Sequence, residues 1–132
     1  MKKILVVEDE PMICEVCRRV LIGEGFEVDC AVNGMVAQDM IEGKQYDFCL
    51  IDMRTPKMNG KELYQWLQKK YPQLAVRVIF TTGDVMGGDI QSFLEQSGRP
   101  FLRKPFTPAE LKTIVQVSLL DSGLSIWVKS IP

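Results

Sequence analysis

The most constraining feature of the chain is a short apolar run that ends in a carboxylate. Residues 48–51 are all apolar, Asp52 follows them directly, and a loop containing Pro56 and Gly60 comes next. A run this short and this uniformly apolar is typical of a strand buried on both faces of a parallel sheet. In open α/β sheets, ligands and chemistry lie at the carboxyl ends of the strands, and Asp52 stands at such an end.

Three other strand-like runs also lead into polar side chains. They are residues 2–7 before Glu8, Asp9 and Glu10, residues 76–80 before Thr81 and Thr82, and residues 99–102 before Lys104. Because the carboxyl ends of parallel strands meet at one edge of a sheet, we expect acids, a hydroxyl and a lysine to converge there.

The apolar runs alternate with stretches of helical spacing, which predicts a parallel sheet with helices on both faces. The predicted strands cover residues 2–7, 26–31, 47–51, 76–80 and 99–102, and the most polar, 26–31, is predicted to be an edge. Right-handed crossovers leave few topologies. The predicted fold class is α/β: a doubly wound, flavodoxin-like sheet of five parallel strands, (βα)5, in the order 2-1-3-4-5.

Several helix starts carry recognisable signals. Pro11 suits a first helical turn, Asn33 is a predicted N-cap, and Asn59 or Gly60 is predicted to begin the third helix. A fourth helix is expected at residues 89–96, weakened by two preceding glycines, and Thr107 with Glu110 forms a predicted capping box before the fifth. In the first helix, Ile13, Val16 and Val20 recur at helical spacing and are expected to face inward.

Composition bounds the functions that this chain can have. Its 132 residues make about one domain, predicted at residues 1–121, with residues 122–132 as a tail or linker without an assigned role. The net charge of −1 shows neither a nucleic-acid footprint nor a membrane-surface charge. The absence of histidine excludes Ser-His-Asp and Cys-His catalysis, so a phosphohistidine, if one is involved, belongs to another molecule.

The cysteines and the N-terminal residues indicate a cellular compartment and give no evidence of a catalytic or metal-binding role for the thiols. Cys14 and Cys17 have C-x-x-C spacing but lie inside a predicted helix, so we expect reduced thiols that are buried or half-buried. No basic-plus-apolar leader opens the sequence and no apolar stretch approaches about 20 residues, so a cytoplasmic location without membrane contact is expected.

The acids at the strand ends suggest a specific chemistry. Glu8, Asp9 and Asp52 in a partly desolvated pocket would repel one another unless a cation joined them. Carboxylates with room for water suit Mg²⁺ or Mn²⁺. Such an ion would screen Asp52 so that its carboxylate can attack an electrophilic phosphorus, with Lys104 and Thr82 as donors to the developing charge.

These motifs resemble those of the response regulator receiver (CheY-like) domains of two-component phosphorelay signalling, over about residues 2–121. The motifs are Glu8-Asp9, Asp52 with Pro56 and Gly60, Thr82-Gly83, and Lys104-Pro105. The resemblance implies that Asp52 is the phosphoacceptor, and that Mg²⁺ is held by Glu8, Asp9, Asp52 and the main-chain carbonyl of Arg54. It implies that Lys104 bridges to the phosphoryl group, that Thr82 moves on phosphorylation and that Phe101 reorients with it. A cis bond between Lys104 and Pro105 is also expected.

The resemblance further implies partners and an output. The donor would be a sensor histidine kinase or a histidine phosphotransfer protein. The surface of the fourth helix, last strand and last helix would switch, with a possible phosphorylation-dependent homodimer and no nucleic-acid contact by the domain itself. The chain would be a signalling phosphoacceptor rather than an enzyme with turnover, acting alone or as one receiver of a hybrid kinase.

Three alternatives stay open on the sequence. An aspartyl-nucleophile phosphohydrolase would need a second acid two positions after the nucleophile, where Arg54 stands. A flavodoxin-like flavin protein would need a phosphate-binding loop after the first strand, where Glu8, Asp9 and Glu10 would repel a phosphate. A pseudo-receiver would bind a partner without being phosphorylated.

Overall fold

The computed structural model describes residues 1–83, 88–120 and 130–131. Strands and helices alternate in the order β1 (Lys3–Val7), α1 (Pro11–Gly23), β2 (Glu27–Ala31), α2 (Gly34–Gly43), β3 (Phe48–Asp52), α3 (Gly60–Lys70), α4 (Pro72–Ala75), β4 (Val78–Thr82), α5 (Gly88–Ser97), β5 (Phe101–Arg103), α6 (Pro108–Leu120) and β6 (Ser130–Ile131). All paired strands are parallel, in the order β2-β1-β3-β4-β5-β6. The predicted five-stranded order 2-1-3-4-5 is confirmed, and β2 lies at an edge as expected.

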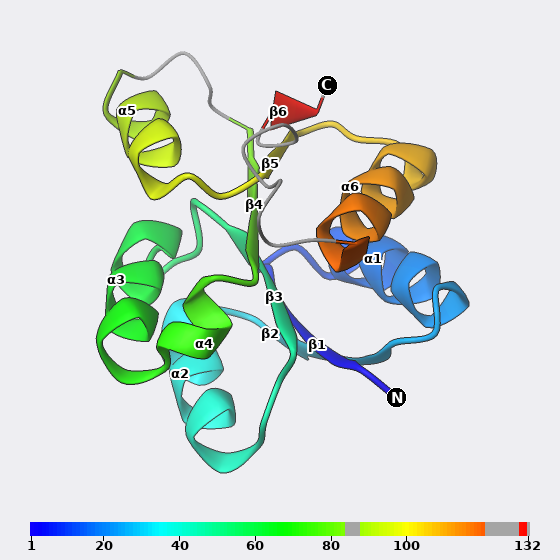
Figure 1. Ribbon diagram of the computed structural model, residues 1–132, viewed down its shortest axis with the longest axis horizontal. Helices are drawn as coiled ribbons and strands as arrows, with labels where there is room; N and C mark the ends of the chain where they lie inside the picture. The colour runs from blue at the N-terminus through cyan, green and yellow to red at the C-terminus, as the bar shows by residue number, and fades with distance from the viewer. Residues whose placement is uncertain (84–87, 121–129, 132) are drawn as a thin grey trace.

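The sheet separates two layers of helices (Figure 1). Because side chains alternate along a strand, Leu5 and Val7 of β1 pack with α2, α3 and α5, whereas Ile4 and Val6 pack with α1 and α6. The central strand β3 is buried along its whole length, which explains why its sequence is a continuous apolar run rather than an alternating one.

The helix starts follow the predicted capping signals. Asn33 accepts a hydrogen bond from the Val36 amide at 2.9 Å and caps α2. Asn59 and Glu62 form a capping box at α3. Thr107 and Glu110 form the predicted capping box at α6.

Two local predictions were wrong. The strand predicted at residues 76–80 begins at Val78, because residues 72–75 form the short helix α4, for which Pro72 supplies a favourable first position. In α1, Val16 is 41% exposed and the fully buried positions are Cys17 and Leu21. Ile13 and Val20 do pack against the core and Cys17 is buried as expected, so only the placement of Val16 was wrong.

A short strand that was not predicted extends one edge of the sheet. Ser130 and Ile131 of β6 pair with Phe101 and Leu102 of β5. Two residues of the predicted tail 122–132 therefore contact the domain through main-chain pairing. Residues 84–87, which include the first of the two glycines expected to weaken α5, lie outside the described residues.

Candidate functional site

Parallel pairing brings the predicted polar residues to one edge of the sheet. Glu8 directly follows β1, Asp52 is the last residue of β3, Thr82 ends β4 and Lys104 directly follows β5. The Lys104 amide donates to the Thr82 carbonyl at 2.8 Å, which fixes the start of the Lys104 side chain beside the end of β4. The peptide bond between Lys104 and Pro105 is cis, as predicted.

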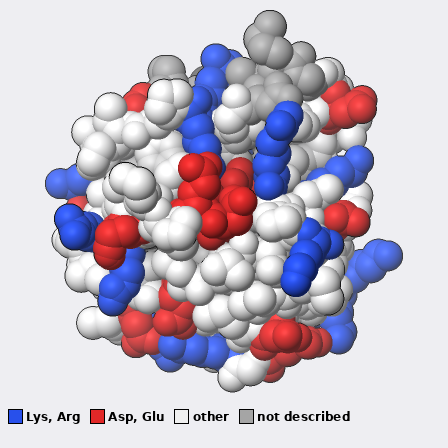
Figure 2. Space-filling model, turned by 180° about the vertical axis from the view of Figure 1, so that it is seen from behind, with Lys and Arg blue, Asp and Glu red and all other residues white. Residues whose placement is uncertain are grey.

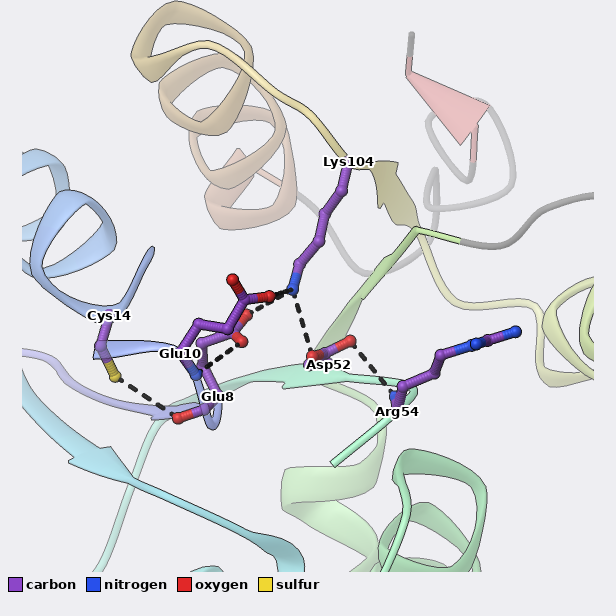
Figure 3. A network of polar contacts seen from close by, with 6 residues as sticks. All are labelled: Glu8, Glu10, Cys14, Asp52, Arg54 and Lys104. Carbon is purple, nitrogen blue, oxygen red and sulfur yellow. Dashed lines mark hydrogen bonds and ion pairs between the residues drawn. The ribbon is translucent and has the colours of Figure 1, made fainter. Parts of the chain in front are cut away.

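Lys104 extends across the strand ends and joins two carboxylates (Figure 3). Its Nζ lies 2.7 Å from Oε1 of Glu8 and 3.1 Å from Oδ2 of Asp52. Glu10 lies further away, with its Oε1 4.0 Å from the same nitrogen. The contact with Asp52 was expected, but the shorter one to Glu8 was not, since nothing in the sequence ranks the two acids.

The site combines deep burial with concentrated charge. Glu8 and Asp52 are buried and Asp9 is exposed. Burial raises the pKa of Glu8, and the negative charge of Asp52 raises it further, while the hydrogen bond from Lys104 lowers it without cancelling the rise. Burial alone would lower the pKa of Lys104, but its contacts with Glu8 and Asp52 outweigh that effect and raise it.

The loop after Asp52 is held close to the carboxylate. The Arg54 amide donates to Oδ1 of Asp52 at 3.2 Å, while the Arg54 side chain points away from that carboxylate (Figure 3). Thr55 is buried and donates through Oγ1 to the Met58 carbonyl at 2.8 Å. This hydrogen bond from the Thr55 hydroxyl fixes the conformation of the loop directly before Pro56.

Two glycines allow this loop to pack closely. A Cβ added at Gly34 would lie 2.1 Å from the Met58 carbonyl oxygen, and one at Gly60 would lie 2.9 Å from Cα of Met53. No side chain fits at either place without movement of the main chain. The close approach of α2 and α3 to the Asp52 loop therefore depends on both glycines.

Thr82 and Phe101 lie in neighbouring strands on the other side of Asp52 from Glu8. Thr82 is fully buried and pairs in register with Arg103, while Thr81 pairs with Asp52. Phe101 is 6% exposed and pairs with Phe80. The aromatic ring predicted to reorient is therefore packed inside the protein in this structure.

The acidic residues form a donor set that fits a hard divalent cation. Carboxylate oxygens of Glu8, Asp9 and Asp52 all lie within 4.8 Å of one another. Three oxygen ligands leave positions for water, which suits Mg²⁺ because that ion dehydrates reluctantly. Figure 2 shows acidic side chains gathered near the centre of the face turned away from the viewer in Figure 1, with basic side chains beside them.

Sequence reasoning missed how the acidic loop is supported. The Glu8 amide donates to the Ala31 carbonyl at 2.9 Å, and the Cys14 thiol lies 3.8 Å from the Glu8 carbonyl oxygen. Oε2 of Glu8 also accepts from the Glu10 amide at 3.2 Å. These contacts link β1 to β2 and α1, and no motif in the sequence reports them.

The chain belongs to the response regulator receiver domain family, whose pattern matches residues 4–116. It is therefore a receiver domain of the kind found in two-component signalling. The response regulator protein PilR of Pseudomonas aeruginosa is 32% identical over 118 residues, which are 89% of this chain and 26% of PilR. The chain spans between 21% and 58% of the length of five curated relatives that it matches, several of which are named as transcriptional regulators.

Solved structures agree with the fold. A CheY-like receiver domain protein from Methanospirillum hungatei has a TM-score of 0.83 and 27% identity, covering 93% of this chain and 97% of that one. The response regulator TrrA from Thermotoga maritima, solved in complex with Mg²⁺ and BeF, has a TM-score of 0.77 and 32% identity, covering 89% of this chain and 99% of that one. Among the described residues, no helix has the length and apolar character needed to cross a bilayer.

Proposed function

We propose that Asp52 accepts a phosphoryl group from a phosphohistidine on a partner protein. An oxygen of the carboxylate attacks phosphorus, the P–N bond breaks, and its electron pair stays on the imidazole nitrogen. The position of Asp52 at the carboxyl end of β3, 3.1 Å from the Lys104 ammonium, is the observation that carries this proposal. The donor is a sensor histidine kinase or a histidine phosphotransfer protein, since this chain has no histidine.

Glu8, Asp9 and Asp52, with the main-chain carbonyl of Arg54, would hold Mg²⁺ or Mn²⁺. The ion supplies charge neutralisation for the transferring group. Two observations support this assignment: carboxylate oxygens of Glu8, Asp9 and Asp52 lie within 4.8 Å of one another, and all three side chains offer only oxygen ligands. Asp9 is exposed, so water and an incoming phosphoryl group could reach an ion held by these residues.

Lys104 and Thr82 respond to the new charge on Asp52. A phosphoryl group brings acceptor oxygens that an ammonium and a hydroxyl can bind. Lys104 already lies between Glu8 and Asp52, so a short movement of its ammonium would reach these oxygens. Movement of Thr82 towards them would leave space that Phe101 could occupy, because Phe101 and Thr82 lie on the neighbouring strands β5 and β4.

The surface formed by α5, β5 and α6 is the proposed output of this switch. It contains Phe101, and any phosphorylation-dependent partner or homodimer contact is expected there. Residues 1–121 are the receiver unit and residues 122–132 a tail or linker, of which Ser130 and Ile131 pair with β5. The unit acts alone or as one receiver of a larger regulator or hybrid kinase, in the cytoplasm, without contacting nucleic acid itself.

The role is that of a signalling phosphoacceptor, not of a phosphohydrolase with steady turnover. Arg54 occupies the position where such an enzyme needs its second acid. The test is exposure to acetyl phosphate or phosphoramidate with Mg²⁺. One phosphoryl group should be gained, hydroxylamine should remove it as it removes acyl phosphates, and Asp9→Ala or excess EDTA should abolish the reaction. Equal labelling in EDTA would contradict the role given to the metal.

A further inference from the structure

Two thiols that the proposed phosphotransfer does not use lie against each other behind the acidic site. Cys14 belongs to α1 and Cys30 to β2; both line one pocket, and each thiol is close enough to shift the pKa of the other. All four cysteines are free, and Cys14 and Cys30 are half-buried whereas Cys17 and Cys49 are buried. The pair is therefore the part of the thiol set that solvent can reach.

A pocket gives small reagents access to both sulfur atoms. Its volume is about 370 Å³, and Cys14 and Cys30 line it together with Glu8, Asp9 and Arg18. The thiol pair thus shares a wall with two of the three carboxylates proposed to hold the metal.

The same two segments hold the main chain of Glu8. Its amide donates to the carbonyl of Ala31, which follows Cys30, and its carbonyl lies 3.8 Å from the sulfur of Cys14 (Figure 3). A change in the separation of the two thiols would therefore act on the residue that binds Lys104 at 2.7 Å.

We propose that Cys14 and Cys30 are a redox-active dithiol, which hydroperoxides oxidise to a disulfide that displaces the main chain at Glu8. The Cys30 thiolate attacks the peroxide oxygen, the O–O bond breaks, and the alcohol or water leaves with a proton. The Cys14 sulfur then attacks the sulfenic acid on Cys30, so that an S–S bond forms and water departs. The two thiols lose two electrons and two protons, and the peroxide is reduced.

The surroundings favour Cys30 as the attacking sulfur. Interaction with the neighbouring Cys14 thiol lowers its pKa, against the effect of burial, and the positive charge of Arg18 lowers it further. Cys14 lines the same pocket beside Cys30, as a resolving thiol must.

Oxidation would change the support of the acidic loop in two ways. Both thiols are free, and an S–S bond of about 2.05 Å is much shorter than any non-bonded contact between two sulfur atoms, so α1 and β2 must approach each other at this point. Cys14 also loses its single thiol hydrogen, which donates to the Glu8 carbonyl oxygen from a sulfur 3.8 Å away. The consequence for phosphotransfer rests on the proposed function, whereas formation of the disulfide does not.

The test uses the full chain treated with hydrogen peroxide, quenched, and blocked with N-ethylmaleimide under denaturing conditions. Cleavage after glutamate separates Cys14 in residues 9–15 from Cys17 in 16–24 and Cys30 in 28–42. We expect one link between 9–15 and 28–42, with loss of two of the four reactive thiols. Dithiothreitol should reverse it, which distinguishes it from oxidation of the exposed Met12.

Matched variants and a second readout complete the test. Cys30→Ser should abolish the link, whereas Cys17→Ser and Cys49→Ser should retain it. In metal-free protein, the amide resonances of Glu8, Asp9 and Glu10 should shift on oxidation, and those of α2 far from the thiols should not. No link, a link through Cys17, or unshifted resonances at these three residues would overturn the proposal. Neither readout requires Asp52 to be phosphorylated, so failure of the proposed function would be seen separately.

Discussion

Nζ of Lys104 lies 2.7 Å from Oε1 of Glu8, although 96 positions separate the two residues in the sequence. The same nitrogen lies 3.1 Å from Asp52. One cation therefore offsets the repulsion between two buried carboxylates in the state described here. A divalent metal would share this task, which makes the lysine and the metal partly interchangeable in their effect on stability.

Replacing Lys104 should expose this dependence. Lys104→Met leaves Glu8 and Asp52 buried without their cation, so the free energy of unfolding in metal-free buffer should fall by about 2 kcal/mol. Added Mg²⁺ should restore part of it. Urea unfolding with and without Mg²⁺ measures both effects. Lys112→Met is the matched control, since its ion pair with Glu24 is long, at 3.7 Å, and Lys112 itself is exposed, so the pair should contribute less than about 0.5 kcal/mol. Equal losses in the two variants would contradict the account.

Gly34→Ala should damage the loop that follows Asp52. The new methyl group would lie 2.1 Å from the Met58 carbonyl oxygen, so the loop or α2 must move, at a cost of about 2 kcal/mol in unfolding free energy. Gly43→Ala, in the same helix, meets nothing within 4 Å and should be neutral or slightly stabilising. Thermal unfolding of both variants is the measurement. A stable Gly34→Ala protein would show that the close packing of α2 on this loop is not needed.

The edge strand β2 should supply acid-sensitive stability. Asp29 accepts from Tyr46 at 2.6 Å and from Lys44 at 2.9 Å, and these bonds hold its pKa below the ordinary value near 3.8. Because the folded pKa is the lower one, the stabilisation is complete above the ordinary value and is lost as the pH falls through the folded pKa. At neutral pH, the free energy of unfolding of Asp29→Asn should therefore be lower than that of wild type, by about 1 kcal/mol or less. This difference in unfolding free energy should disappear when the pH falls below the folded pKa of Asp29.

Urea unfolding of wild type and Asp29→Asn across this pH range measures the effect. Tyr46→Phe removes one of the two hydrogen bonds and keeps every charge, so it should lose part of the same stabilisation. A difference between wild type and Asp29→Asn that persists unchanged below both pKa values would contradict the assignment to Asp29.

Saturation of Asp52 with beryllofluoride should change hydrogen exchange in α5 and β5. The proposed movements of Thr82 and Phe101 act on these elements, and α5 begins with Gly88, which favours local opening. Protection of residues 88–103 should change in wild type and much less in Thr82→Ala. Exchange in α2 serves as the internal reference. Unaltered protection with a saturated Asp52 would remove the basis for a switch through this surface.

The sequence predicted the site because strand ends are easy to recognise and parallel sheets align them. The continuous burial of β3 made Phe48 to Asp52 unmistakable, and the caps at Asn33, Asn59 and Thr107 marked the helices. Contacts between segments that are distant in the sequence could not be predicted in this way. The Lys104–Glu8 bond and the Cys14–Cys30 pair depend on side-chain direction across α1, β1 and β2, which no local pattern encodes.

The errors have the same origin. Helical spacing in α1 identified Ile13 and Val20 correctly, but packing against the sheet buries Cys17 and Leu21 and leaves Val16 exposed. The start of β4 was predicted two residues too early because the sequence of Val76 and Arg77 is compatible with a strand. In the structure these two residues connect α4 to β4, which begins at Val78. Pairing of β6 with β5 spans an intervening segment that carries no strand signal, so it could not be foreseen from residues 130–131 alone.

Intact mass after incubation with acetyl phosphate and Mg²⁺ tests the central claim most directly. Wild type should gain one phosphoryl group, Asp52→Asn should gain none, and Asp39→Asn, which changes an exposed acid of α2, should behave as wild type. The amide keeps the size of the side chain but cannot act as the nucleophile. Undiminished labelling of Asp52→Asn, or a wild-type protein that gains no mass while Mg²⁺ is bound, would contradict the assignment of Asp52 as the phosphoacceptor.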